Sequence, residues 1–128
     1  MAKKVIMIDD NEDDLFYTQI VFERSGLHVS MEQFTSAKEA LAYFESGVLS
    51  EPALVLLDIN MPGMSGFDFL AAYGELPSER RASAVVVMLT SSIDDRDRET
   101  ALQFPAVKAF LSKPIDAQAA AAVMNKLP

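Results

Sequence analysis

Residues 53–66 read ALVLLDINMPGMSG, and the character of the chain changes sharply within this stretch. The apolar run Ala53–Leu57 stops at Asp58. A run that is apolar throughout is typical of a strand buried on both faces of a parallel sheet. The residues after Asp58 are typical of a turn, and Ser65 with Asp68 can open a helix. This stretch therefore predicts a buried strand, a loop and a helix in succession.

The same succession recurs along the chain. The other apolar runs that predict strands are Val5–Ile8, Val29–Phe34, Ala84–Leu89 and Val107–Leu111. Helices are predicted from Glu12 to near Gly26, from Ser36 to near Gly47, from Ser65 to Gly74, from Ser92 and Asp95 onward, and from Asp116 to near Leu127. Five repeats of strand then helix predict an α/β fold, a single doubly wound parallel sheet with helices on both faces.

Two further expectations concern single side chains. Leu15, Phe16 and Phe22 have helical spacing, so we expect them to face the core. His28 is the only histidine and falls near a helix-to-strand turn, where we expect it at the surface. A serine–histidine–aspartate catalytic triad is therefore disfavoured.

The composition excludes several classes of protein. The chain has 128 residues, which is about the length of one domain, so we expect a single domain over residues 1–128. A net charge of −8 disfavours nucleic-acid binding, and the lack of cysteine excludes disulfides and thiolate chemistry. The N-terminal residues do not resemble a signal peptide, and no apolar run is long enough to span a membrane. We therefore expect a cytoplasmic protein.

Polar side chains follow the predicted strands where each strand ends, namely Asp9, Asp10, Asp58, Thr90 and Lys113. Because parallel strands end at one edge of the sheet, we expect these side chains to meet. Three carboxylates repel one another unless a cation neutralises them, and ligands that are all oxygen indicate Mg²⁺. A metal, an ammonium and a hydroxyl together suit phosphoryl transfer, with one aspartate as the acceptor.

Each of these motifs has a simpler explanation when it is taken alone. Asp9 and Asp10 can cap the helix that follows them, and Lys113 can belong to an ordinary turn before proline. A calcium loop starting at Asp9 is excluded, because its sixth and twelfth positions hold Asp14 and Ile20 instead of glycine and glutamate. The complete set, present in order, favours a site over separate caps and turns.

Four short motifs resemble those of one known family. They are Ile8-Asp9-Asp10-Asn11, Leu57-Asp58-Ile59-Asn60-Met61-Pro62-Gly63-Met64-Ser65-Gly66, Leu89-Thr90-Ser91 and Ser112-Lys113-Pro114. In this order they resemble a CheY-type response-regulator receiver domain, and the resemblance covers essentially the whole chain. It implies a flavodoxin-like fold with strand order 2-1-3-4-5, which the apolar pattern alone does not specify.

The resemblance also implies roles for the matching residues. Asp58 would be the phosphoacceptor and Lys113 the phosphate-pairing lysine, whose bond to the following proline is typically cis. Mg²⁺ would be held by Asp10 directly, by Asp9 mostly through water, by Asp58, and by the backbone carbonyl of Asn60. These assignments are expectations carried over from the family.

The expected switch residues are Thr90, whose hydroxyl would turn toward the phosphoryl group, and Phe110 at the aromatic position. Tyrosine is commonest at that position, and phenylalanine excludes coupling through a tyrosyl hydroxyl. Asn60 and Ser92 would flank the phosphoryl group and set its lifetime.

The function implied is two-component phosphorelay signalling. The phosphodonor would be a histidine kinase or a phosphotransfer protein. Phosphorylation would reshape the face built from the fourth helix, the fifth strand and the fifth helix, which would then bind a downstream protein target; a homodimer through the same face is a further hypothesis. The chain would not be an enzyme beyond its own Mg²⁺-dependent phosphorylation and dephosphorylation.

Three alternatives remain beside this reading. A haloacid-dehalogenase type phosphatase shares Mg²⁺ and an aspartyl nucleophile, but it needs Asp-x-Asp where this chain has Asp9-Asp10-Asn11. A nucleotide or flavin binder needs a phosphate loop rich in glycine, serine or threonine after the first strand, and acidic residues stand there. A receiver-like scaffold that works without phosphorylation is opposed only by the completeness of the motif set.

Overall fold

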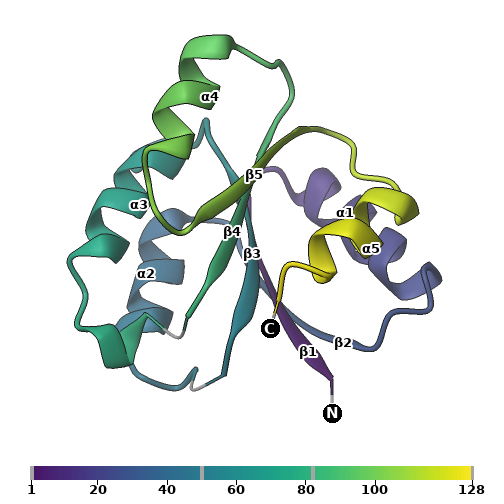
Figure 1. The fold of residues 1–128 in the computed structure, drawn as a ribbon, viewed down its shortest axis with the longest axis horizontal. Helices are drawn as coiled ribbons and strands as arrows, with labels where there is room; N and C mark the ends of the chain where they lie inside the picture. The colour runs from purple at the N-terminus through teal and green to yellow at the C-terminus, as the bar shows by residue number, and fades with distance from the viewer. Residues whose placement is uncertain (1, 50, 82, 128) are drawn as a thin grey trace.

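In the computed structural model, which describes residues 2–49, 51–81 and 83–127, a parallel sheet lies between two layers of helices (Figure 1). The strands are β1 (Lys3–Ile8), β2 (Val29–Phe34), β3 (Ala53–Asp58), β4 (Val85–Thr90) and β5 (Val107–Ser112). The helices are α1 (Glu12–Arg24), α2 (Ala37–Glu45), α3 (Gly66–Gly74), α4 (Asp95–Leu102) and α5 (Ala117–Met124), with a 3-10 helix, η1 (Ser78–Arg80). The strand order is β2-β1-β3-β4-β5, as the family resemblance implied.

Side chains alternate between the two faces of the sheet, and each face has its own core. On β1, Ile6 and Ile8 pack with α2, α3 and α4, whereas Val5 and Met7 pack with α1 and α5. Figure 1 shows the same division of helices, with α1 and α5 on one side of the sheet. All six residues of β3 and of β4 are buried, which explains why their sequences are apolar almost throughout.

Polar side chains cap the first turns of several helices. Asn11 caps α1 by accepting from the Asp14 N–H, and Ser65 with Asp68 forms a reciprocal capping box on α3. The predicted start of the fourth helix at Ser92 is wrong. Asp94 caps α4 instead, because its carboxylate accepts from the Arg96 N–H.

Phe16 does not join the core. Leu15 and Phe22 are buried, but the Phe16 side chain is 65% exposed. Neighbouring helical residues point about 100° apart, so with Leu15 facing the sheet the next side chain turns toward solvent. His28 is exposed, as predicted.

The described residues form one sheet with its covering helices. The predicted domain of residues 1–128 also includes residues 1, 50, 82 and 128, which lie outside the described part. Among the described helices, none has the length and apolar character needed to cross a bilayer.

Candidate functional site

The carboxyl ends of the strands bring the predicted site residues to one edge of the sheet. Asp9 follows β1, Asp58 and Thr90 are the last residues of β3 and β4, and Lys113 follows β5. Oxygens of Asp9, Asp10 and Asp58 all lie within 4.8 Å of one another. Asp9 and Asp58 are buried, whereas Asp10 is exposed, so the carboxylate cluster opens to solvent on the Asp10 side.

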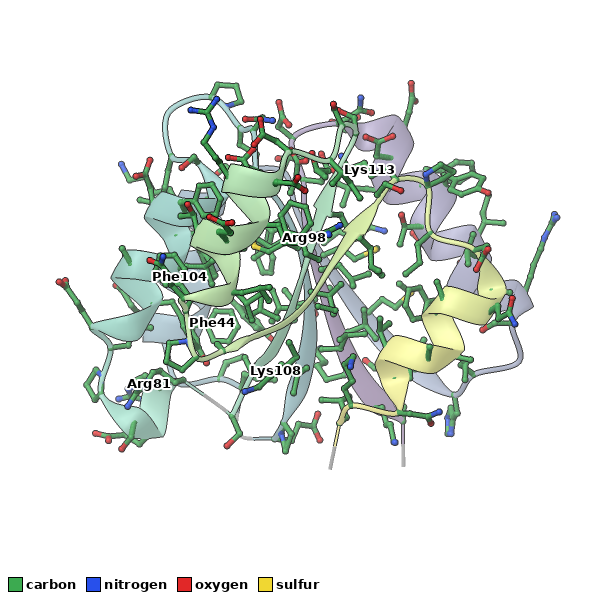
Figure 2. All side chains as sticks on the ribbon, turned by 45° about the horizontal axis from the view of Figure 1, so that its top comes forward. Phe44, Arg81, Arg98, Phe104, Lys108 and Lys113 are labelled. Carbon is green, nitrogen blue, oxygen red and sulfur yellow. The ribbon has the colours of Figure 1, made fainter. Side chains whose placement is uncertain are left out.

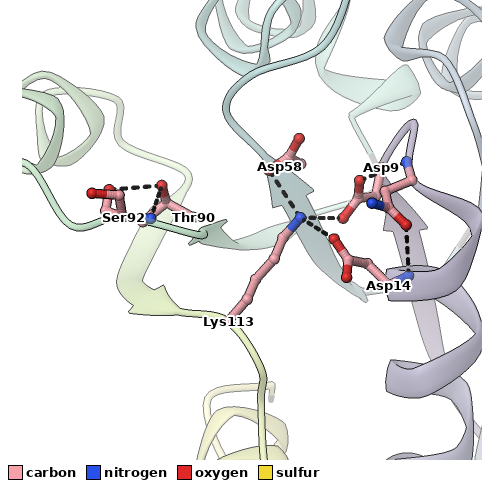
Figure 3. Close-up of polar contacts among 7 residues, drawn as sticks. Asp9, Asp14, Asp58, Thr90, Ser92 and Lys113 are labelled. Carbon is pink, nitrogen blue, oxygen red and sulfur yellow. Dashed lines mark hydrogen bonds and ion pairs between the residues drawn. The ribbon is translucent and has the colours of Figure 1, made fainter.

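Lys113 ties this cluster together (Figure 3). Its Nζ lies 2.6 Å from Asp9 Oδ2, 2.9 Å from Asp14 Oδ2 and 3.2 Å from Asp58 Oδ1. The Lys113 backbone N–H also donates to the Thr90 carbonyl at 2.7 Å, which positions the lysine relative to β4. The peptide bond between Lys113 and Pro114 is cis, as the resemblance implied.

Asp14 is the residue of this cluster that the sequence analysis missed. In the sequence it stands only at the sixth position of the excluded calcium loop; in the structure its pairing with Lys113 joins α1 to the segment after β5. The available signal was its place in the first turn of a helix capped by Asn11. That signal predicts that Asp14 lies at the start of a helix. It does not predict that a lysine from the far end of the chain contacts it.

The electrostatics of the cluster favour an ionised lysine and a less acidic Asp58. Burial and, after it, the charge of Asp9 raise the pKa of Asp58 to about 6, although Lys113 opposes the shift. Burial alone would lower the pKa of Lys113, but its hydrogen bonds to Asp9 and Asp14 outweigh burial and raise it. Asp58 is therefore mostly ionised at neutral pH and can act as a nucleophile.

The donor set fits Mg²⁺. The three clustered side chains offer only carboxylate oxygens, which are the ligands that a hard divalent cation prefers, and Asp10 leaves room for water. Asp9 is already oriented, because its Oδ1 accepts the Asn11 N–H at 3.0 Å. The acidic pocket is thus consistent with the Mg²⁺ binding predicted from the sequence.

The Thr90 hydroxyl is bound to the loop before α4 and not to the Lys113 cluster (Figure 3). It donates to the Ser92 carbonyl at 2.9 Å and accepts from the Ser92 N–H at 3.2 Å. Asn60 and Ser92, the two predicted flanking residues, are both exposed. Asn60 lies in the β3–α3 loop, which closes on itself through a hydrogen bond from the Gly66 N–H to the Ile59 carbonyl at 2.8 Å.

Phe110, the predicted aromatic switch residue, is buried on β5 with 8% of its surface exposed. The guanidinium carbon of Arg98, on α4, lies 5.7 Å from the centre of the Phe110 ring. This is the distance range of a cation–π contact. The ring is therefore already turned inward while Thr90 is still bound to Ser92.

Comparison with known proteins matches this chain to one family. The family model described as "Response regulator receiver domain" matches residues 5–125. The chain belongs to this family. All of the site residues discussed above, from Asp9 to Lys113, fall inside the matched region of the receiver domain.

The receiver domain has relatives among archaeal and bacterial proteins. It is 32% identical over 114 residues to the probable methanogenesis regulatory protein FilR2 of Methanothrix harundinacea, covering 87% of this chain and 72% of that protein. It is 25% identical over 122 residues to Protein PilH of Pseudomonas aeruginosa, covering 95% of this chain and 94% of that protein. The solved response regulator receiver protein from Dyadobacter fermentans gives a TM-score of 0.86 at 32% identity, covering 98% of this chain and 97% of that one.

These comparisons place the receiver domain in two-component phosphorelay signalling, as the sequence motifs predicted. Receiver domains are phosphorylated by histidine kinases, and the family is generally one of signalling proteins, not of enzymes. The comparisons do not favour the phosphatase alternative.

Proposed function

We propose that this receiver domain accepts a phosphoryl group on Asp58 from the phosphohistidine of a histidine kinase or a phosphotransfer protein. The observation that carries the proposal is the meeting of Asp58 with Asp9, Asp10 and Lys113 at one sheet edge. Clustered acids have no packing role there, and an ammonium 3.2 Å from the acceptor carboxylate suits phosphoryl transfer.

The chemistry assigned to Asp58 is nucleophilic. One carboxylate oxygen attacks the phosphorus atom, a new O–P bond forms, and the N–P bond of the phosphohistidine breaks, leaving neutral imidazole after it takes up a proton. Lys113 stays charged and donates to the oxygens of the transferred group. Asp9, Asp10, Asp58 and the backbone carbonyl of Asn60 would hold Mg²⁺, which supplies positive charge that offsets both the carboxylates and the phosphoryl group. Hydrolysis of the acyl phosphate by water returns the carboxylate, so the domain turns over only its own phosphoryl group.

The proposed switch starts at Thr90. Its hydroxyl must exchange the Ser92 backbone for the phosphoryl group, which pulls on the loop before α4. Because the Phe110 ring is already buried, the switch requires a smaller movement of this ring than it would of an exposed one. The α4–β5–α5 face would then bind a downstream protein target, or a second copy of the domain, and Asn60 and Ser92 would set how long the phosphoryl group lasts.

Intact-protein mass spectrometry tests this assignment. Wild-type protein and the Asp58→Asn variant are incubated with acetyl phosphate, and separately with a phosphorylated histidine phosphotransfer protein, with and without Mg²⁺. We expect one added phosphoryl group that requires both Mg²⁺ and Asp58. If Asp58→Asn gains the group as readily as wild type, Asp58 is not the acceptor. If neither donor modifies wild type, a scaffold that works without phosphorylation replaces this proposal.

A further inference from the structure

The Lys113 ammonium is shared by three carboxylates, and the proposed function explains only two of them. Asp9 and Asp58 belong to the acceptor site, with side chains 10% and 8% exposed. Asp14 comes from the first turn of α1, its side chain is 41% exposed, and its Oδ2 accepts from Lys113 Nζ at 2.9 Å. Nothing in phosphoryl transfer as described above needs this third carboxylate.

We propose that Asp14 is a positioning residue that holds Lys113 on the α1 side of the site and competes with the phosphoryl group for its ammonium. This inference rests on the proposed function, because it assumes that a phosphoryl group on Asp58 takes up a hydrogen bond from Lys113. Asp14 then sets how strongly the unphosphorylated site retains its lysine.

The argument begins with the donors of the ammonium. A lysine ammonium has three N–H donors; two of them bond Asp9 and Asp14, and Asp58 Oδ1 lies 3.2 Å from the same nitrogen as an ion-pair partner. A phosphoryl group on Asp58 replaces that carboxylate as the partner of Lys113, so any second hydrogen bond that it takes from the ammonium must displace Asp9 or Asp14. The one displaced will be the carboxylate whose release leaves the least uncompensated charge away from water.

Exposure identifies that carboxylate as Asp14. Releasing Asp9 would break the shortest contact, at 2.6 Å, and leave a buried charge without its partner. Releasing Asp14 exposes its oxygens to water, which can solvate them, so the exchange costs far less. Asp14 is also held in place at its backbone, since its N–H donates to Asn11 Oδ1 at 3.1 Å and keeps the side chain within reach of Lys113.

Asp13 provides a matched control. It precedes Asp14 in the same first turn of α1 and carries the same charge, but it is exposed and no ion pair to it is found among the described residues. Replacing either acid with asparagine removes one negative charge near the site and one favourable interaction with the helix dipole. A difference between the two variants therefore isolates the contact with Lys113.

The test is an equilibrium measurement with beryllofluoride, which coordinates to a carboxylate oxygen and mimics a phosphoryl group. Its dissociation constant is measured at saturating Mg²⁺ for wild type, Asp13→Asn and Asp14→Asn by NMR titration. In parallel, the ¹⁵N resonance of the Lys113 ammonium is followed in metal-free protein. We expect Asp14→Asn to bind about two- to fivefold more tightly than Asp13→Asn, the range for a half-exposed ion pair, and to shift the Lys113 resonance where Asp13→Asn does not.

The outcomes separate the two proposals. Equal affinities of Asp14→Asn and Asp13→Asn for beryllofluoride would show that Asp14 does not compete for Lys113. Weaker binding by Asp14→Asn would show instead that Asp14 aids binding of the phosphoryl group. If wild type itself fails to bind beryllofluoride at Asp58, the proposed function fails and takes this inference with it. Thermal unfolding of each variant verifies that the protein tested is folded.

Discussion

Gly66 lies against the backbone of Asp58 so closely that no side chain fits between them. A Cβ atom built on Gly66 would sit 2.5 Å from the Asp58 carbonyl oxygen and 3.1 Å from the Ile59 Cα. The close approach lets the first residue of α3 pack on the end of β3. The glycine of this motif therefore supports the strand end that carries the central carboxylate of the site.

Replacing Gly66 with alanine should destabilise the fold by about 2–4 kcal/mol, because backbone atoms must shift to admit the new methyl group. Gly74, the last residue of the same helix, is the control, since a Cβ there would meet nothing within 4 Å. We expect Gly74→Ala to be neutral or slightly stabilising. Urea unfolding measures both, and equal free energies of unfolding for the two variants would contradict the steric argument.

The raised pKa of Asp58 predicts a pH-dependent stability. Because the folded carboxyl has a pKa of about 6 against an unfolded value of 3.8, the folded state binds more protons between these values, and stability falls as pH rises through the window. Asp58→Asn should therefore be more stable than wild type at pH 7, by about 1–3 kcal/mol without Mg²⁺. This gain in stability should disappear below about pH 4. Chemical unfolding of both proteins in EDTA across this pH range measures it, and a gain that does not change with pH would contradict the raised pKa as its cause.

Removing the Lys113 ammonium should make the fold depend more strongly on Mg²⁺. Lys113→Gln leaves Asp9 and Asp58 without their positive partner. We therefore expect the free energy of unfolding, measured in EDTA, to fall by about 2–4 kcal/mol. Added Mg²⁺ should raise the melting temperature of this variant more than that of wild type. Lys108→Gln is the control, since Lys108 is exposed toward the other end of β5 (Figure 2) and its ammonium donates only to the Pro105 carbonyl among the described residues. Similar Mg²⁺ responses in Lys113→Gln and wild type would argue against a metal beside Lys113.

The Arg98 contact should stabilise the inward position of Phe110. Arg98→Ala removes the guanidinium from the Phe110 ring. We expect the free energy of unfolding to fall by about 0.5–1 kcal/mol and the Phe110 ring resonances to shift in NMR spectra. Arg96→Ala serves as the comparison, because Arg96 is exposed on the same helix. Unchanged Phe110 resonances in Arg98→Ala would mean that core packing alone holds the ring.

Local patterns were sufficient for the kind and order of the helices and strands, apart from the start of α4, and for the edge at which the site lies. The apolar run that stops at Asp58 predicts a strand and its end, because burial on both faces leaves no room for polar residues until the strand emerges. Helix caps such as Asn11 and Ser65 are likewise local, since cap and first turn are neighbours in sequence. The order of the strands was not local, and it came from the family resemblance.

Side-chain conformations and long-range partners were decided only when the chain had folded. No local pattern shows that Asp14 and Lys113, from opposite ends of the chain, meet at 2.9 Å, or that Arg98 lies over Phe110. Phe16 points outward for the same reason, since the face of α1 that packs depends on how the helix lies on the sheet. The sequence alone determined which elements form and where the acids collect, because those depend on neighbouring residues. The tertiary structure decided which carboxylates hold the lysine, because that depends on distances between elements set by packing.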